Sequence, residues 1–87
     1  GVTVKAVVTK SGIKTAEGIK AEFEENLTEY LKKNAFTAEK ILYHRIAYLL
    51  MDIDGVENYT TLTVNGSTAD ITIAQNEIAV LSGVEVS

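Results

Sequence analysis

The sequence lacks cysteine and any long hydrophobic run. Without thiols the chain cannot form a disulfide framework, a thiolate zinc site or a cysteine nucleophile. Its longest run of apolar residues, Ile46 to Met51, is far shorter than the roughly 20 residues that a membrane-spanning helix needs. The first residues also lack the charged and then apolar pattern of a signal peptide. We therefore predict a protein that does not enter a membrane.

Basic residues are missing from the second half of the chain. Through Arg45 there are eight Lys or Arg and six Asp or Glu, whereas beyond Arg45 there are six acidic residues and no basic one. A protein that binds nucleic acid needs clustered Lys and Arg to replace the counterions of the phosphates. No such cluster with aromatic residues occurs here, so we predict no nucleic-acid partner.

The composition is otherwise that of a folded globular domain. Hydrophobic residues make up 46% of the 87 residues and charged residues 23%, whereas disordered segments have less apolar and more charged content. A chain of this length closes one hydrophobic core rather than two, so we expect a single domain over residues 1–87. Because the chain opens with Gly1 and its only methionine is Met51, we also expect it to be a segment of a longer protein.

Apolar periodicity predicts a strand followed by two helices. Alternation of apolar and polar residues predicts a strand from Val2 to Thr9. Apolar residues at three- and four-residue intervals predict an amphipathic helix from about Thr15 to Asn34, with Thr15 as its N-cap. The same capping signal at Thr37 predicts a second helix, from about Ala38 to Asp52. A link this short predicts that the two helices are antiparallel.

The last third of the chain returns to strand periodicity. Asn65-Gly66 lies between two alternating segments, which is a strong signal for a β-hairpin. Residues 78–86 predict a last short strand. The predicted order is therefore strand, helix, helix and three strands. We interpret this order as a two-layer α+β fold, in which an antiparallel helical hairpin packs on one face of a small, mainly antiparallel sheet.

One segment imitates a catalytic motif. Asp52-Ile53-Asp54-Gly55 follows an apolar run, as the Asp-x-Asp-Gly motif of haloacid-dehalogenase-like phosphatases does. Those enzymes also need a downstream lysine and further acidic magnesium ligands on a doubly wound parallel sheet, and no Lys follows Asp54 here. The lone His44 has no partner at the spacing of a triad or a metal site, so we interpret it as a helix-surface residue. We predict no enzyme activity, no metal or cofactor, and no small-molecule substrate.

Several short segments in the second half of the chain together carry a family resemblance. They are Asp54-Gly55-Val56-Glu57-Asn58-Tyr59, Leu62-Thr63-Val64-Asn65-Gly66, Ala69-Asp70-Ile71-Thr72-Ile73 and the stretch from Glu77 to Val86. In this order and spacing they resemble the C-terminal end of baseplate J-like proteins, which usually have proline where this chain has Ala79. The upstream strand and helices match the family's order, so the resemblance covers nearly the whole chain.

The resemblance implies a non-enzymatic wedge component in the baseplate of a contractile phage or prophage tail. It implies that residues 1–87 come from the C-terminal end of a longer protein that is made in the bacterial cytoplasm. Its partners would be other baseplate or tail proteins, or copies of itself. The alternative is a small ligand-binding or regulatory α+β domain, which should show a concave pocket with convergent polar groups.

The second predicted helix is apolar on more than one side. We predict that Leu42, Ile46 and Leu49 form its core stripe. Five other residues of this helix form the predicted interface: Tyr43, Ala47, Tyr48, Leu50 and Met51. An apolar surface left exposed in the free domain predicts weak self-association. We expect Leu50→Lys to reduce that association at little cost in stability.

Overall fold

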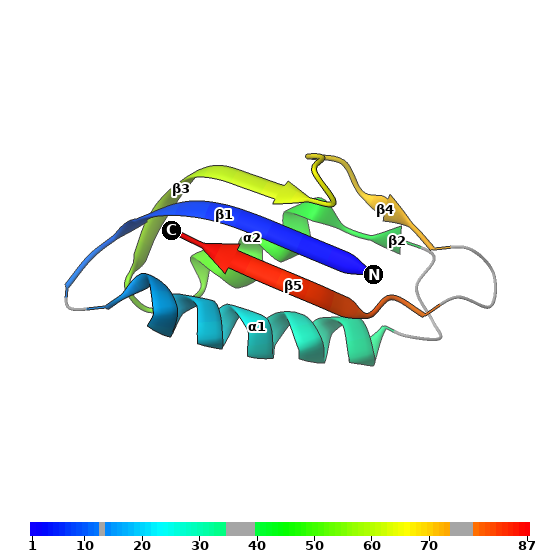
Figure 1. The fold of residues 1–87 in the computed structure, drawn as a ribbon, viewed down its shortest axis with the longest axis horizontal. Helices are drawn as coiled ribbons and strands as arrows, with labels where there is room; N and C mark the ends of the chain where they lie inside the picture. The colour runs from blue at the N-terminus through cyan, green and yellow to red at the C-terminus, as the bar shows by residue number, and fades with distance from the viewer. Residues whose placement is uncertain (13, 35–39, 74–77) are drawn as a thin grey trace.

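Two helices and five strands make up the part of the chain that the structure describes. The structure is a computed structural model, and it describes residues 1–12, 14–34, 40–73 and 78–87. The elements in chain order are β1 (Val2–Lys10), α1 (Ala16–Lys33), β2 (Lys40–Ile41), α2 (Tyr43–Met51), β3 (Val56–Val64), β4 (Ile71–Thr72) and β5 (Leu81–Val86) (Figure 1). The α+β class predicted from the sequence is confirmed.

The main sheet has three strands in the order β3-β1-β5. β3 is antiparallel to β1, whereas β5 is parallel to it, so the sheet is mixed rather than mainly antiparallel. Whether a strand is parallel or antiparallel to its neighbour depends on the end of the sheet at which the chain enters. The alternation of residues along a strand does not contain this information. The chain returns to the start of β1 before β5 begins (Figure 1), and this is the crossover that a parallel neighbour requires.

β4 does not form the predicted hairpin with β3. It pairs instead with β2, antiparallel, in a separate two-stranded sheet. The predicted turn at Asn65-Gly66 is nevertheless present, with φ angles of 51° and 75°. Val64 and Ser67 exchange backbone hydrogen bonds across this turn. The two-residue turn is therefore made, but the chain leaves the sheet soon after it.

Asn65 joins the turn to β1. Its backbone N–H donates to the carbonyl oxygen of Thr3 at 2.8 Å. Its side-chain Oδ1 accepts from the backbone N–H of Thr3 at 2.8 Å, and its Nδ2 donates to the carbonyl oxygen of Gly1 at 3.3 Å. The turn therefore closes the β1–β3 pair at the start of the chain.

α1 follows the prediction from the sequence. Thr15 is its N-cap, and the Thr15 Oγ1 accepts a hydrogen bond from the Gly18 N–H at 3.1 Å. Its buried residues are spaced four apart: Ile19, Phe23, Leu27 and Leu31. Asn34 ends the helix, and its side-chain Nδ2 donates to the carbonyl oxygen of Tyr30 at 2.8 Å.

α2 begins later than predicted. Lys40 and Ile41 are strand residues, and the first helical residue is Tyr43, so the predicted start near Ala38 is wrong for residues 40–42. Pairing with β4 explains the difference, because it holds Ile41 extended and fully buried in the core. The predicted cap at Thr37 lies outside the described residues.

A residue distant in sequence caps α2. Leu42 occupies the N-cap position and makes no side-chain hydrogen bond there. The Oδ1 of Asp70, just before β4, instead accepts from the backbone N–H of Tyr43 at 2.8 Å. A carboxylate at this end of a helix satisfies a free N–H group and faces the positive end of the helix dipole.

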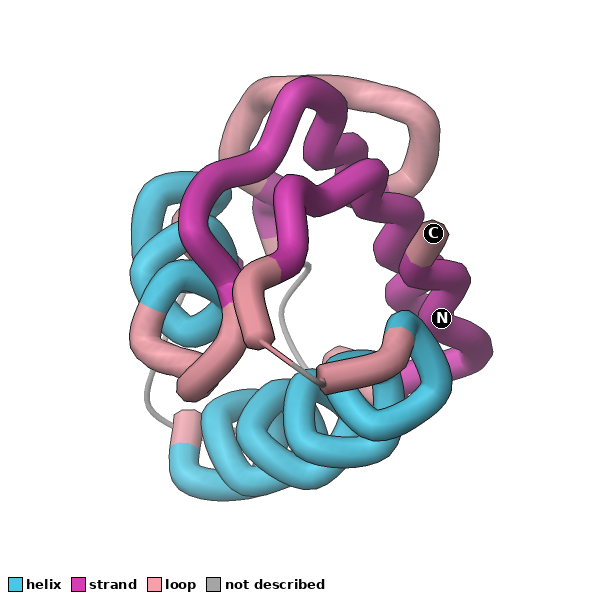
Figure 2. Tube along the Cα trace, turned by 90° about the vertical axis from the view of Figure 1, so that its left-hand side faces the viewer, coloured by secondary structure: helices cyan, strands magenta, loops and turns pink. Residues whose placement is uncertain are grey.

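One apolar core joins the main sheet to both helices. Figure 2 shows α1 and α2 on the concave side of the curved sheet. The buried residues are Val2, Val4, Ala6 and Val8 of β1, Leu62 and Val64 of β3, Val84 of β5, those of α1 named above, Ile46, Ala47 and Leu50 of α2, and the loop and β2 residues Ile53 and Ile41. β1 thus turns alternate residues towards the helices, as its sequence predicts.

Candidate functional site

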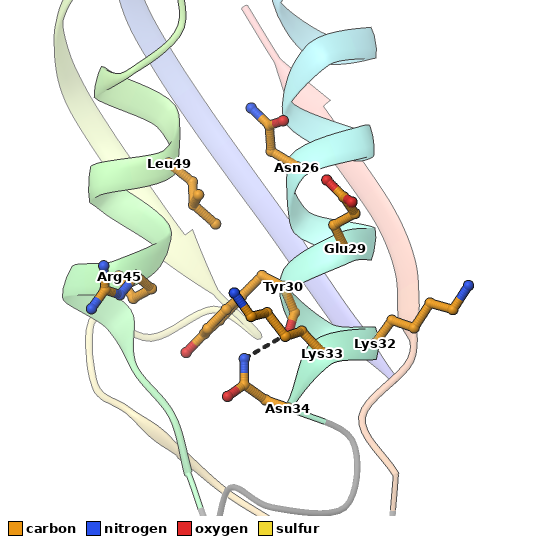
Figure 3. Close-up of a pocket in the computed structure, with 8 residues that line it drawn as sticks. All are labelled: Asn26, Glu29, Tyr30, Lys32, Lys33, Asn34, Arg45 and Leu49. Carbon is orange, nitrogen blue, oxygen red and sulfur yellow. Dashed lines mark hydrogen bonds between the residues drawn. The ribbon is translucent and has the colours of Figure 1, made fainter.

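An open groove lies between α1 and α2. Its volume is about 870 Å³. Its walls are Asn26, Glu29, Tyr30, Lys32 and Lys33 of α1, the C-cap Asn34, and Arg45 and Leu49 of α2 (Figure 3). Figure 3 shows that the two helices run in opposite directions, so the end of α1 faces the beginning of α2.

Tyr30 fixes the two helices relative to each other at this groove. Its hydroxyl accepts a hydrogen bond from the backbone N–H of Leu42 at 3.2 Å, which ties α1 to the residue before α2. Its carbonyl oxygen accepts from the side chain of Asn34, as described above. Leu49 is half-buried beside it and supplies an apolar part of the groove. The groove therefore has a fixed, partly apolar base.

The residues around the groove include more basic than acidic side chains, although the chain as a whole has a net charge of −4. Lys32, Lys33 and Arg45 are exposed and line it together with one acidic residue, Glu29. Lysines at the C-terminus of α1 also lie at the negative end of the helix dipole. Over the described ranges the ion pairs are Lys5–Glu85 and Lys14–Glu22, so the groove's cations are in none of them.

Sequence reasoning missed this groove. Lys32 and Lys33 stand in the last turn of α1, a position that favours basic residues in any helix. Arg45 lies far from them in sequence, and only the antiparallel packing of α1 and α2 places all three residues around one groove. Figure 3 shows that Lys33 extends across the groove towards α2, whereas the charged ends of Lys32 and Arg45 point away from it. The sequence shows that α1 ends in basic residues. It does not show that Arg45 and Leu49 of α2 form the opposite wall of a groove there.

The structure places the five predicted interface residues in different environments. Tyr48 and Met51 are exposed, at 56% and 38%. Leu50 and Ala47 are buried, at 0% and 7%, so the prediction that they lie on the surface is wrong. The side of α2 that faces the core carries Ile46, Ala47 and Leu50. Leu49 lies on another side of the helix and is therefore only half-buried, at the groove. Because α2 is apolar on several sides, its sequence alone did not identify the core side.

Tyr43, the fifth of these residues, anchors α2 to the sheet. It is half-buried, and its hydroxyl donates to the carbonyl oxygen of Leu62 in β3 at 2.8 Å. Burial raises the pKa of Tyr43 above its ordinary value of 10.0, and the nearby Tyr59 adds to the rise. This hydrogen bond gives Tyr43 a role within the domain.

The segments that imitate catalytic sites are surface features. Asp52 and Asp54 are exposed in the turn between α2 and β3. His44 is exposed on α2, as predicted, with its ring edge-to-face against Tyr43 at 5.6 Å between centroids. Among the residues that the structure describes, no three His, Asp or Glu side chains are grouped so that they could hold a metal ion. Nor is any helix in these ranges long and apolar enough to cross a membrane.

Comparison with known proteins agrees with the resemblance noted in the sequence. The family model described as the Baseplate J-like protein C-terminal domain matches residues 2–87, essentially the whole chain. A search of curated proteins finds no significant match. The family consists of structural components of the phage tail baseplate. The chain therefore belongs to the Baseplate J-like protein C-terminal domain family.

Proposed function

We propose that this chain is a structural assembly module of a contractile phage-like tail baseplate, and that it acts through protein–protein contacts. Its family supplies the location in the baseplate. The observation that carries the contact mechanism is the open groove between α1 and α2, across which Lys33 extends (Figure 3). In this proposal residues 1–87 act as one domain at the C-terminal end of a longer protein, made in the bacterial cytoplasm before assembly.

The surface of α2 beside the groove has the composition of a protein interface. Leu42 and Tyr48 are large apolar residues that are 44% and 56% exposed. The guanidinium carbon of Arg45 lies 5.8 Å from the centre of the Tyr48 ring, which holds a cation against an aromatic face. Tyrosine and arginine are enriched among the residues that contribute most to binding between proteins. We therefore assign the partner contact to the groove and this side of α2.

The test is assembly of particles in the host that encodes the protein. We expect Tyr48→Ser and Arg45→Glu each to lower the yield of complete particles, because each removes part of the proposed contact. Val7→Ser and Lys5→Glu are matched controls, since both residues are exposed on the outer side of β1. Electron microscopy and mass spectrometry of purified particles would give the yield and composition.

Equal losses in the control variants would show that the groove has no special role. Normal particles from both groove variants would contradict the proposal. That result would favour the alternative, a small ligand-binding or regulatory domain, which needs no contact at this surface.

A further inference from the structure

Asn65 is followed by glycine, the neighbour that makes an asparagine side chain most reactive. The backbone nitrogen of the next residue can attack the side-chain Cγ of an asparagine, and a glycine at that position has no Cβ to obstruct the attack. Each of the other four asparagines in the chain precedes a larger residue. Asn65 and Gly66 are both exposed, so water reaches the site.

The fold holds this side chain away from Gly66. Its Oδ1 accepts from the N–H of Thr3 at 2.8 Å, and its Nδ2 donates to the carbonyl oxygen of Gly1 at 3.3 Å. The side-chain amide is therefore directed towards the beginning of the chain. The backbone bonds between the residues on either side of Asn65-Gly66 also fix the peptide groups of the turn. Attack by the Gly66 nitrogen thus requires the turn to separate from β1.

The turn opens more easily than the core of the domain. Besides the two side-chain bonds, the N–H of Asn65 donates to the carbonyl oxygen of Thr3 at 2.8 Å. No atom of the described structure would lie within 4 Å of a Cβ at Gly66, so nothing packs on the tip of the turn. Exposed segments with few apolar contacts open at a lower free energy than a whole domain. The Asn65 side chain is therefore released at intervals while the rest of the domain stays folded.

We propose that Asn65 is a site of spontaneous deamidation, which becomes reactive only when the turn separates from β1. The Gly66 nitrogen then bonds to Cγ of Asn65, and the Cγ–Nδ2 bond breaks as ammonia leaves with the Gly66 amide proton. The product is a succinimide ring. Water opens this ring at Cγ to give aspartate, or at the main-chain carbonyl to give isoaspartate. The net reaction consumes water and releases ammonia in equal amounts.

Either product weakens the closure of the β1–β3 pair. An aspartate at this position lacks the Nδ2 donor and places a carboxylate beside the carbonyl oxygen of Gly1, so repulsion replaces a hydrogen bond. Isoaspartate carries the main chain through its side-chain carbons, which lengthens the turn and disturbs the register that pairs Val4 with Val64. The modified turn therefore cannot return to its original set of bonds.

Incubation of the 87-residue chain at mildly alkaline pH tests the site, because a native sample can be compared with one unfolded in guanidinium chloride. Digestion after glutamate releases residues 58–77, and tandem mass spectrometry separates deamidation at Asn65 from that at Asn58 in this peptide. We expect Asn65 to deamidate at least about tenfold more slowly in the native sample, because only the opened turn reacts. Asn58, which precedes tyrosine, should change little in either sample. No deamidation of Asn65 in the unfolded sample, or equal rates in both, would overturn the proposal.

Two variants test the effect of the reaction on the fold. Asn65→Asp reproduces one product. Asn58→Asp is the matched control, because it adds the same charge at an exposed position where the hydrogen bond uses Oδ1 and not Nδ2. We expect Asn65→Asp to melt about 4 to 8 °C below Asn58→Asp, since it alone loses a hydrogen bond to the beginning of the chain. Equal melting temperatures would overturn the proposed effect on the turn.

Discussion

Replacing Leu50 by alanine tests which side of α2 packs on the sheet. Leu50 is 0% exposed and belongs to the core, whereas its neighbour Leu49 is half-buried at the groove. The substitution removes three carbon groups, which is about 2.4 kcal/mol of transfer free energy at about 0.8 kcal/mol each. The cavity left behind adds to this, so we expect the free energy of unfolding to fall by about 3 to 4 kcal/mol. Leu49→Ala is the matched control and should cost about 1 kcal/mol, because much of its side chain stays in water.

Urea denaturation followed by circular dichroism would measure both losses. In a domain of this size each kcal/mol lowers the melting temperature by about 4 to 8 °C, so Leu50→Ala should lower it by at least about 12 °C. Leu50→Lys should unfold the domain, because it places an ammonium group in an apolar core. This reverses the expectation from the sequence that Leu50→Lys costs little stability. If Leu49→Ala proved as costly as Leu50→Ala, the core side assigned to α2 would be incorrect.

Three further substitutions test contacts between distant parts of the chain. Asp70→Ala should lower the free energy of unfolding by about 1 kcal/mol, because α2 loses its cap, and Asp70→Asn should retain most of it; chemical denaturation would compare the two. Tyr43→Phe should cost about 1 kcal/mol through the lost hydrogen bond to Leu62. Because the folded pKa of Tyr43 is raised, its neutral form contributes stability that is present below pH 10.0 and is lost as pH rises through the folded pKa. Melts at alkaline pH should therefore fall more steeply in the wild type than in Tyr43→Phe, and equal slopes would contradict this. Asn65→Ala should lower the free energy of unfolding by about 1 to 2 kcal/mol, because alanine disfavours a φ of 51° and cannot accept the hydrogen bond from Thr3. Asn65→Gly removes the backbone strain but not the loss of this hydrogen bond. A melting temperature equal to that of the wild type in Asn65→Gly would therefore show that the side-chain hydrogen bond contributes nothing.

The sequence by itself determined the elements whose signals are local. Alternation predicted β1, and four-residue spacing with the Thr15 cap predicted α1, because each pattern repeats with the period of one secondary structure. Asn65-Gly66 predicted its turn, because these residues accept positive φ at low cost. The same order of segments identified the family, which matches residues 2–87.

Tertiary structure decided the features that depend on residues distant in sequence. α2 begins at Tyr43 because Ile41 pairs with β4 and Asp70 supplies the cap, and neither partner is near in sequence. The core side of α2 was ambiguous because apolar residues surround the helix, so only its packing on the sheet separated Leu50 from Leu49. The groove likewise exists only where two antiparallel helices meet, because a local pattern shows which residues a helix has and not which distant residues the fold places beside them.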